Sequence, residues 1–91
     1  MLICQVVGNV WATKKEESLT GKKMMIVRRA DEHGSYEKGE CFVAADIVGA
    51  GIGEQVLVVN GSTARTAMGD NAIPVDAVIV GIIDSLEIKE E

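Results

Sequence analysis

The chain is short, apolar and acidic. Its 91 residues suffice for one domain, 47% of them are hydrophobic, and nine basic against fourteen acidic residues leave a formal net charge of −5 at pH 7. This charge argues against nucleic-acid binding, which needs a basic surface, and no apolar run approaches the length of a membrane span. No signal peptide is recognisable at the start, so we expect a cytosolic protein.

Five segments rich in β-branched and apolar residues, separated by polar or glycine-containing turns, predict strands. In chain order these segments are residues 2–12, 22–29, 41–48, 54–59 and 77–88. The last one also fits two short strands broken near Gly81.

Helical character is confined to a segment between the last two predicted strands. Alanines favour a helix over residues 62–68, with Ser62 placed to cap its start and Gly69 placed to end it. Five strands and one short helix predict an all-β fold, a small five-stranded β-barrel that takes up the whole chain as a single domain. Closure suits such a chain, because open strand edges invite uncontrolled pairing.

The predicted strands carry apolar side chains on both faces. Residues 56–59 and 78–80 are continuous apolar runs, so they present such side chains inward and outward. The inward side chains fill the barrel, and a neighbouring copy of the chain is the simplest cover for the outward ones. A compact monomer with a valine-rich core is the alternative that composition leaves open.

Residues suited to catalysis or metal binding are few. His33 is the only histidine and lies in a charged turn, where we expect a solvated side chain, because a general base needs a positioned partner. Cys4 and Cys41 lack metal-ligand spacing and are expected to be buried thiols. We therefore predict no catalytic, cofactor or metal site, with a cysteine nucleophile as a disfavoured alternative.

Alternating glycines at positions 49, 51 and 53 raise the question of a phosphate-binding loop. Their spacing is G-x-G-x-G before a strand, whereas the dinucleotide fingerprint is G-x-G-x-x-G before a helix. A structural role is preferred, since glycine permits positive φ and the close approach of two backbones. Whether the approaching backbone belongs to the same subunit or to another one stays open at this level.

A small barrel is also the scaffold of modules that bind nucleic acid or another anionic ligand. Those modules use basic grooves and aromatic stacking platforms, which three aromatic residues and a net negative charge do not favour. Trp11 is better explained as a core or interface anchor.

Residues 46–58, DIVGAGIGEQVLV, resemble the D-x-V-G-A-G-x-G-E-x-V-L-V segment of bacterial microcompartment vertex proteins. These are the pentameric shell proteins of carboxysomes and of ethanolamine-utilisation and related compartments. The resemblance continues through residues 60–65, similar to the family's G-S-[ST]-A-R. Upstream, residues 19–27 resemble its L-x-G-x-K-L-L-x-V strand, with methionines where leucines are common. The likeness covers essentially the whole chain.

This resemblance implies an OB-like β-barrel, similar to the oligonucleotide-binding fold, assembled as a cyclic homopentamer. It implies that the ring caps the vertices of a roughly icosahedral shell in the bacterial cytoplasm, where its partners are other copies of the chain and hexameric shell proteins. The net charge and the short apolar runs predict that neither nucleic acid nor membrane is a partner. We assign to the subunit interface or ring axis Gly49, Gly51, Gly53 and Glu54. The expected structural polar positions are Ser62, Arg65 and Asp76. The alternative for the glycines is a role in the internal turn alone.

Overall fold

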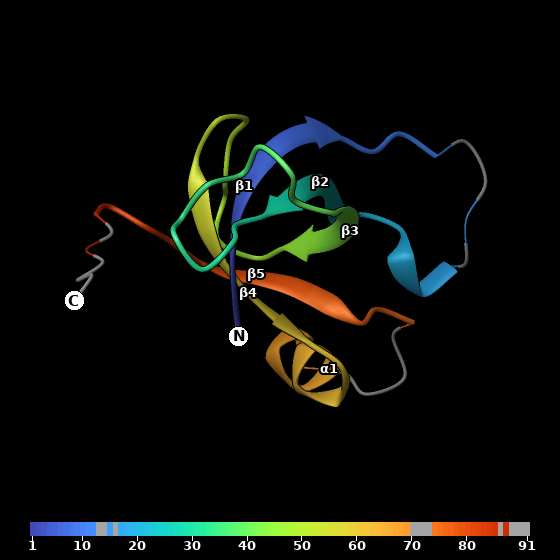
Figure 1. Ribbon diagram of the computed structural model, residues 1–91. Coiled ribbons are helices and arrows are strands. Elements are labelled where there is room, and N and C mark those ends of the chain that lie inside the picture. The colour runs from blue at the N-terminus through green and yellow to red at the C-terminus, as the bar shows by residue number, and fades with distance from the viewer. Residues whose placement is uncertain (13–14, 16, 70–73, 86, 88–91) are drawn as a thin grey trace.

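Five strands close into a barrel, and one helix packs on its outside (Figure 1). The computed structural model describes residues 1–12, 15, 17–69, 74–85 and 87. The strands are β1 (Leu2–Asn9), β2 (Lys23–Arg29), β3 (Cys41–Asp46), β4 (Gln55–Asn60) and β5 (Ala77–Ile82). The helices are α1 (Ser62–Met68) and the single 3₁₀ turn η1 (Glu17–Leu19). The predicted all-β barrel with one short helix is confirmed.

The strands follow the order β1-β2-β3-β5-β4 around the barrel, and β4 pairs back with β1. Adjacent strands of the described chain are antiparallel, apart from β3 and β5, which pair in parallel through Ala45–Val78 and Asp46–Ile79. The pairing register shifts in β1 between Val6 and Gly8, and again where β4 meets β5. Such irregularities bend strands, which helps a small sheet to close.

The barrel interior is a core of small and branched side chains. Met25 is the largest fully buried one, and the others range from valine and isoleucine down to alanine. The interior cluster consists of Cys4, Val6, Met25, Val27, Ala44, Ala50, Val56, Val58, Ala77 and Ile79. Aliphatic residues therefore make up most of the interior.

A second apolar cluster lies outside the barrel, beneath α1. Ala64 of the helix packs there with Val59 of β4, Val78 of β5 and Ala45 of β3. On β5, Ile79 points into the barrel while its neighbour Val78 points outward into this second cluster. Because β5 is buried on both faces, its sequence is continuously apolar and does not alternate.

Several predicted boundaries are wrong in ways that the topology explains. β1 ends at Asn9, before the predicted end at residue 12, and the last strand ends at Ile82 without a break at Gly81. The amide of Ile83 still bonds to the carbonyl of Gln55, where β4 begins, so β5 has no partner beyond that point. The predicted end of this strand, residue 88, lies outside the described residues.

The start of α1 also differs from the prediction. Gly61 is the N-cap residue, and no side chain caps the helix. Ser62 is already the first helical residue, and its carbonyl accepts a hydrogen bond from the Thr66 hydroxyl at 3.3 Å. The other end is as predicted: Gly69 adopts the left-handed conformation with φ 79°, and its N–H bonds to the Thr66 carbonyl.

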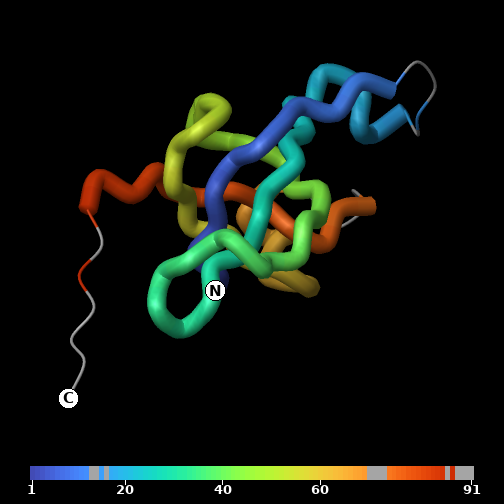
Figure 2. The backbone as a smooth tube through the Cα atoms, turned by 45° about the horizontal axis from the view of Figure 1, so that its top comes forward, coloured from blue at the N-terminus to red at the C-terminus, as the bar shows by residue number. Residues whose placement is uncertain are grey.

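Two irregular segments lie at opposite ends of β2. Figure 2 shows the described residues between β1 and β2 at one end of the barrel and loop 30–40 at the other. The first is held by a bond from the Val10 amide to the Met24 carbonyl, 3.1 Å. Loop 30–40 is held by the Tyr36 hydroxyl, which bonds to the Gln55 side chain at 2.9 Å.

Candidate assembly surface

Asp46 organises the loop in which the sequence placed its main candidate residues. The side chain has no solvent exposure and accepts backbone hydrogen bonds from Val48 at 3.0 Å, Gly49 at 3.2 Å and Ala50 at 2.8 Å. Lys23 of β2 lies 3.1 Å from the same carboxylate and donates to the Ala50 carbonyl at 2.7 Å. The sequence analysis did not predict this role of Asp46, although an aspartate followed by glycine within three residues is typical of such turns.

Glu54 and Gly53 hold the other side of the same loop against β1. The Glu54 carboxylate accepts the Gly51 amide at 2.6 Å. The backbone is also tied to β1, because the Gly53 amide donates to the Val6 carbonyl at 2.8 Å and the Val6 amide donates to the Glu54 carbonyl at 2.9 Å. The loop is therefore a rigid, hydrogen-bonded support and not a free ligand-binding turn.

The glycines of this loop serve the turn in different ways. Gly49 and Gly53 have φ of +81° and +93°, a conformation that side chains rarely adopt, so the backbone itself requires them. Gly51 has no such angle, and a Cβ there would meet only the Glu54 carboxylate, at 3.3 Å. The assignment of these residues to a subunit interface or ring axis stays a prediction. Of the three glycines, Gly51 is the one that the backbone conformation of the turn does not require.

Large apolar side chains remain exposed on the isolated subunit. Ile52, at the tip of the loop held by Asp46 and Glu54, is 61% exposed. Apart from Met1 and Trp11, the exposed set among the described residues is Val7, Val43, Ile47, Val48, Ile52 and Ile82. An apolar surface of this kind on a small protein is typical of an interaction face.

The predicted structural polar residues lie on and beside α1. Ser62 is exposed. The carbonyl of Asp76 accepts a hydrogen bond from the Gly61 amide at 2.8 Å, and this bond joins the start of α1 to the start of β5. Arg65 is partly buried and makes no side-chain hydrogen bond or ion pair with another described residue. Their structural role stays a prediction.

The two cysteines occupy different environments. Cys4 lies inside the barrel, and burial raises the pKa of its thiol to about 11, against a weaker opposing effect of Arg29. Cys41 is exposed, so its predicted burial is wrong: it shares the outward face of β3 with Val43. Its sulfur accepts a hydrogen bond from the Arg28 Nε at 3.4 Å.

His33 lies in the exposed turn of loop 30–40, as predicted. Its ring is 3.5 Å from the Glu32 carboxylate, and both side chains are largely exposed. Asp31 shapes this turn, and hydrogen bonds from the amides of Ser35 and His33 lower the pKa of its carboxyl. In the part of the chain that the structure describes, no acidic, histidine and cysteine side chains cluster as metal ligands do. Nor does a described helix reach the length and apolarity of a membrane span.

Trp11 lies beyond the end of β1 and is 91% exposed, so it does not belong to the core of its own subunit. The alternative prediction, that Trp11 is an interface anchor, stays a prediction. Beside Trp11, the segments flanking the β1–β2 connection form an open depression of about 380 Å³. Lys15, Lys22 and Lys23 contribute to its lining.

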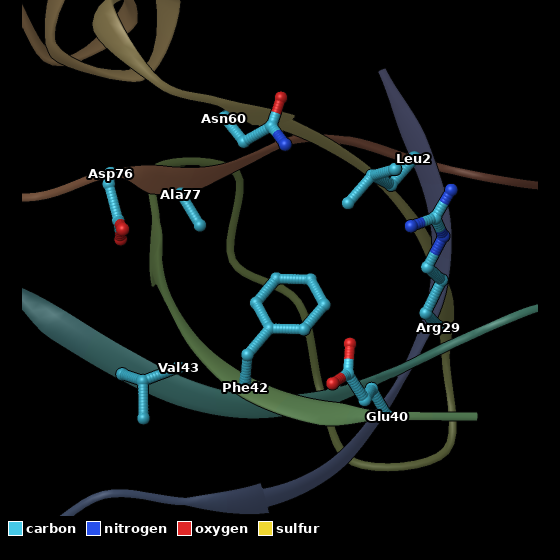
Figure 3. Close-up of a pocket in the computed structure, with 8 residues that line it drawn as sticks. All are labelled: Leu2, Arg29, Glu40, Phe42, Val43, Asn60, Asp76 and Ala77. Atoms are coloured by element: carbon cyan, nitrogen blue, oxygen red, sulfur yellow. The ribbon is translucent and has the colours of Figure 1, made fainter.

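A second depression, of about 410 Å³, lies near the N-terminus of β1. Figure 3 shows the Phe42 ring at its centre, with Leu2 and Ala77 directed toward the same space. The charged side chains around it are Arg29, Glu40 and Asp76. This arrangement has the apolar floor and polar rim of a small socket. Neither depression was predicted from the sequence, because each combines residues from separate strands and loops.

Comparison with known proteins finds relatives that match nearly the whole chain. Residues 1–84 match the family described as "Ethanolamine utilisation protein EutN/carboxysome". The carboxysome shell vertex protein CcmL of Synechocystis sp. is 44% identical over 89 residues, which cover 97% of this chain and 87% of CcmL. The bacterial microcompartment shell vertex protein GrpN of Rhodospirillum rubrum is 42% identical over 87 residues, which cover 96% of this chain and 97% of GrpN.

Solved structures agree with the sequence comparison. The pentameric microcompartment shell protein GrpN of Rhodospirillum rubrum superposes with a TM-score of 0.87 at 39% identity, over 98% of this chain and 100% of that chain. CcmL of Gloeobacter violaceus superposes with a TM-score of 0.89 at 43% identity, over 97% and 90%. These relatives are structural shell proteins, which confirms the prediction of a non-catalytic subunit. The chain belongs to the EutN/CcmL family, whose members include the shell vertex proteins of carboxysomes and of other bacterial microcompartments.

Proposed function

We propose that five copies of this chain form a closed ring that caps the vertices of a bacterial microcompartment shell. The observation that carries the proposal is the full-length match to GrpN, a pentameric shell protein, at 39% identity and a TM-score of 0.87. A ring of this size would carry a formal charge of 5 × −5, or −25. The role is structural: each subunit supplies a rigid barrel and the surfaces that join it to its neighbours.

The exposed apolar side chains support self-association independently of the relatives. A cyclic ring needs a heterologous interface, in which one patch of each subunit meets a different patch of the next. The loop held by Asp46 and Glu54 fits one side of such an interface. Its hydrogen bonds fix the backbone, and it presents the exposed Ile52 without a cost in loop ordering. We assign Gly49, Gly51, Gly53 and Glu54 to this support or to the ring axis.

Hexameric shell proteins are the proposed second partner. A vertex ring meets the facets of a shell along its outer rim, so contacts must exist beyond those between the five copies. Loop 30–40 is a candidate for such contacts, because Asp31 and Tyr36 hold it in a defined shape at one end of the barrel.

Native mass spectrometry of the purified protein tests the ring directly. We expect a dominant species of five chains, and a stable monomer would contradict the proposal.

Co-expression with hexameric shell proteins tests the vertex role. We expect closed particles that contain this chain, whereas closed particles that exclude it would remove the capping function. The alternative of a nucleic-acid-binding barrel predicts salt-sensitive binding of single-stranded oligonucleotides, and the acidic charge predicts none.

A further inference from the structure

Trp11 is the only tryptophan of the chain and, at 91%, the most exposed large apolar side chain among the residues that the structure describes. It lies outside the barrel, beyond the last residue of β1. Tryptophan buries about 150–250 Å² in a packed site and is enriched among the residues that dominate interface energies. A side chain of this kind, held on a projecting segment away from its own core, has the properties of an interface anchor.

The surroundings of Trp11 are basic, although the chain as a whole is acidic. Lys15 and Lys22 line the depression beside it and make no ion pair with any residue that the structure describes. Lys23 also lines it, but its charge is balanced by Asp46 at 3.1 Å. The surface that receives Trp11 should therefore be an apolar socket with carboxylates near its rim.

The depression around Phe42 meets this description. Leu2, Phe42 and Ala77 supply its apolar part, and Glu40 and Asp76 stand at its edge (Figure 3). Among the side chains that line it, the two acidic ones outnumber the single basic one, Arg29. Its volume of about 410 Å³ falls within the range of about 300–1,000 Å³ that is typical of ligand pockets, which is ample for one indole.

The anchor and the socket cannot meet within one subunit. Leu2, which lines the socket, begins β1, whereas Trp11 follows its end at Asn9. At ~3.3 Å per residue the strand separates them by about 20–25 Å. We infer that Trp11 of each subunit enters the Phe42 depression of the next subunit, with Lys22 beside its Glu40 and Asp76. Such a contact joins two different surfaces head to tail, as a cyclic ring requires. The inference rests on the proposed ring.

The single tryptophan makes the inference directly measurable. Native mass spectrometry first establishes whether the rings form. Fluorescence of the same sample then reports on Trp11. We expect a blue-shifted emission and at least a several-fold lower acrylamide quenching constant than in the urea-unfolded chain. A pentamer whose tryptophan is quenched as in the unfolded chain would overturn the contact and leave the proposed function intact. Absence of the pentamer would overturn both.

Charge exchange tests the identity of the socket. We expect Lys22→Glu and Glu40→Lys each to weaken the ring by at least tenfold in dissociation constant, and the double variant to recover most of the loss. Lys38→Glu makes the same change in net charge as Lys22→Glu at a residue that lines neither depression, so it is the matched control for that variant. Carbodiimide treatment should also link Lys22 to Glu40 or Asp76 between chains. Additive losses in the double variant, without such a link, would overturn the assignment.

Discussion

The ammonium group of Lys23 lies 3.1 Å from the Asp46 carboxylate, and the two residues are directly paired across β2 and β3. The lysine side chain is half-exposed, whereas the aspartate side chain is fully buried. The two residues therefore contribute unequally to the stability of the fold. The carboxylate also accepts three backbone amides of the following loop. It is therefore the point from which the backbone of residues 46–50 is held.

Replacement of Asp46 should destabilise the fold more than replacement of its partner. Asp46→Ala leaves three backbone amides and Lys23 without their acceptor, and we expect a loss of about 2–4 kcal/mol in the free energy of unfolding. Lys23→Met keeps the three amide bonds, so its loss should stay near 1 kcal/mol. Urea unfolding followed by circular dichroism measures both. Equal losses would show that the ion pair, and not the amide bonds, holds the loop.

Gly51 and Gly53 form a matched pair that separates folding from assembly. Gly53→Ala places a side chain at φ +93° and should cost about 1–2 kcal/mol of stability. Gly51→Ala requires only a small displacement of the Glu54 carboxylate, so the stability of the subunit should change by less than about 0.5 kcal/mol.

The larger substitution Gly51→Val should then disrupt rings more than it disrupts the barrel. Native mass spectrometry gives the fraction of pentamer, and urea unfolding gives the stability of the same variant. Normal rings in Gly51→Val would remove this residue from the subunit interface.

Gly39 should tolerate no side chain, for a reason unrelated to its backbone angles. A Cβ there would collide with the carbonyl oxygen of Arg29, because loop 30–40 returns closely along the end of β2. That oxygen belongs to backbone and cannot move aside as a flexible side chain would. We expect Gly39→Ala to lower the free energy of unfolding by about 1–3 kcal/mol. Lys38→Ala, at an exposed neighbour, is the control and should be neutral within about 0.5 kcal/mol.

The thiol of Cys4 should make stability depend on pH in the alkaline range. Its pKa is raised from 9.0 to about 11 because burial disfavours the thiolate. The unfolded chain therefore loses this proton first as the pH rises. The contribution of the neutral buried thiol is complete below pH 9.0 and is lost as the pH rises through about 11. Urea unfolding across this window should show a steeper decline for the wild type than for Cys4→Val. Parallel declines would contradict the burial effect.

Iodoacetamide provides a second measurement on the same residue. We expect Cys4 to stay unmodified in the folded protein and to react once urea is added, since the thiolate is the reactive form. Rapid modification of Cys4 under native conditions would instead revive the alternative of a catalytic cysteine.

The sequence was sufficient for the strands and the barrel because these depend on local pattern. The valine-rich segments around Val56 and Val78 are apolar on both faces, and the structure buries Val56 inside the barrel and Val78 under α1. The wrong predictions depend on spatial neighbours. Cys41 looked buried among apolar residues but faces outward, and β5 ends at Ile82 because β4 offers no further partner.

The candidate site was predictable only in part for the same reason. The positive φ angles of Gly49 and Gly53 can be predicted, because a glycine-rich turn is visible in the sequence. The exposure of Trp11 cannot be predicted, because a tryptophan near an apolar strand is equally compatible with a place in the core. The socket around Phe42 joins residues from all five strands and two loops, and their proximity is a product of barrel closure.

The parallel seam between β3 and β5 has a consequence for the dynamics of the barrel. It rests on two residue pairs, Ala45–Val78 and Asp46–Ile79, extended by a long hydrogen bond of 3.5 Å from the Ile47 amide to the Ile79 carbonyl. The other seams have longer ladders. Local opening should therefore begin here, and amide hydrogens along this seam should exchange with solvent before those of the β1–β2 ladder.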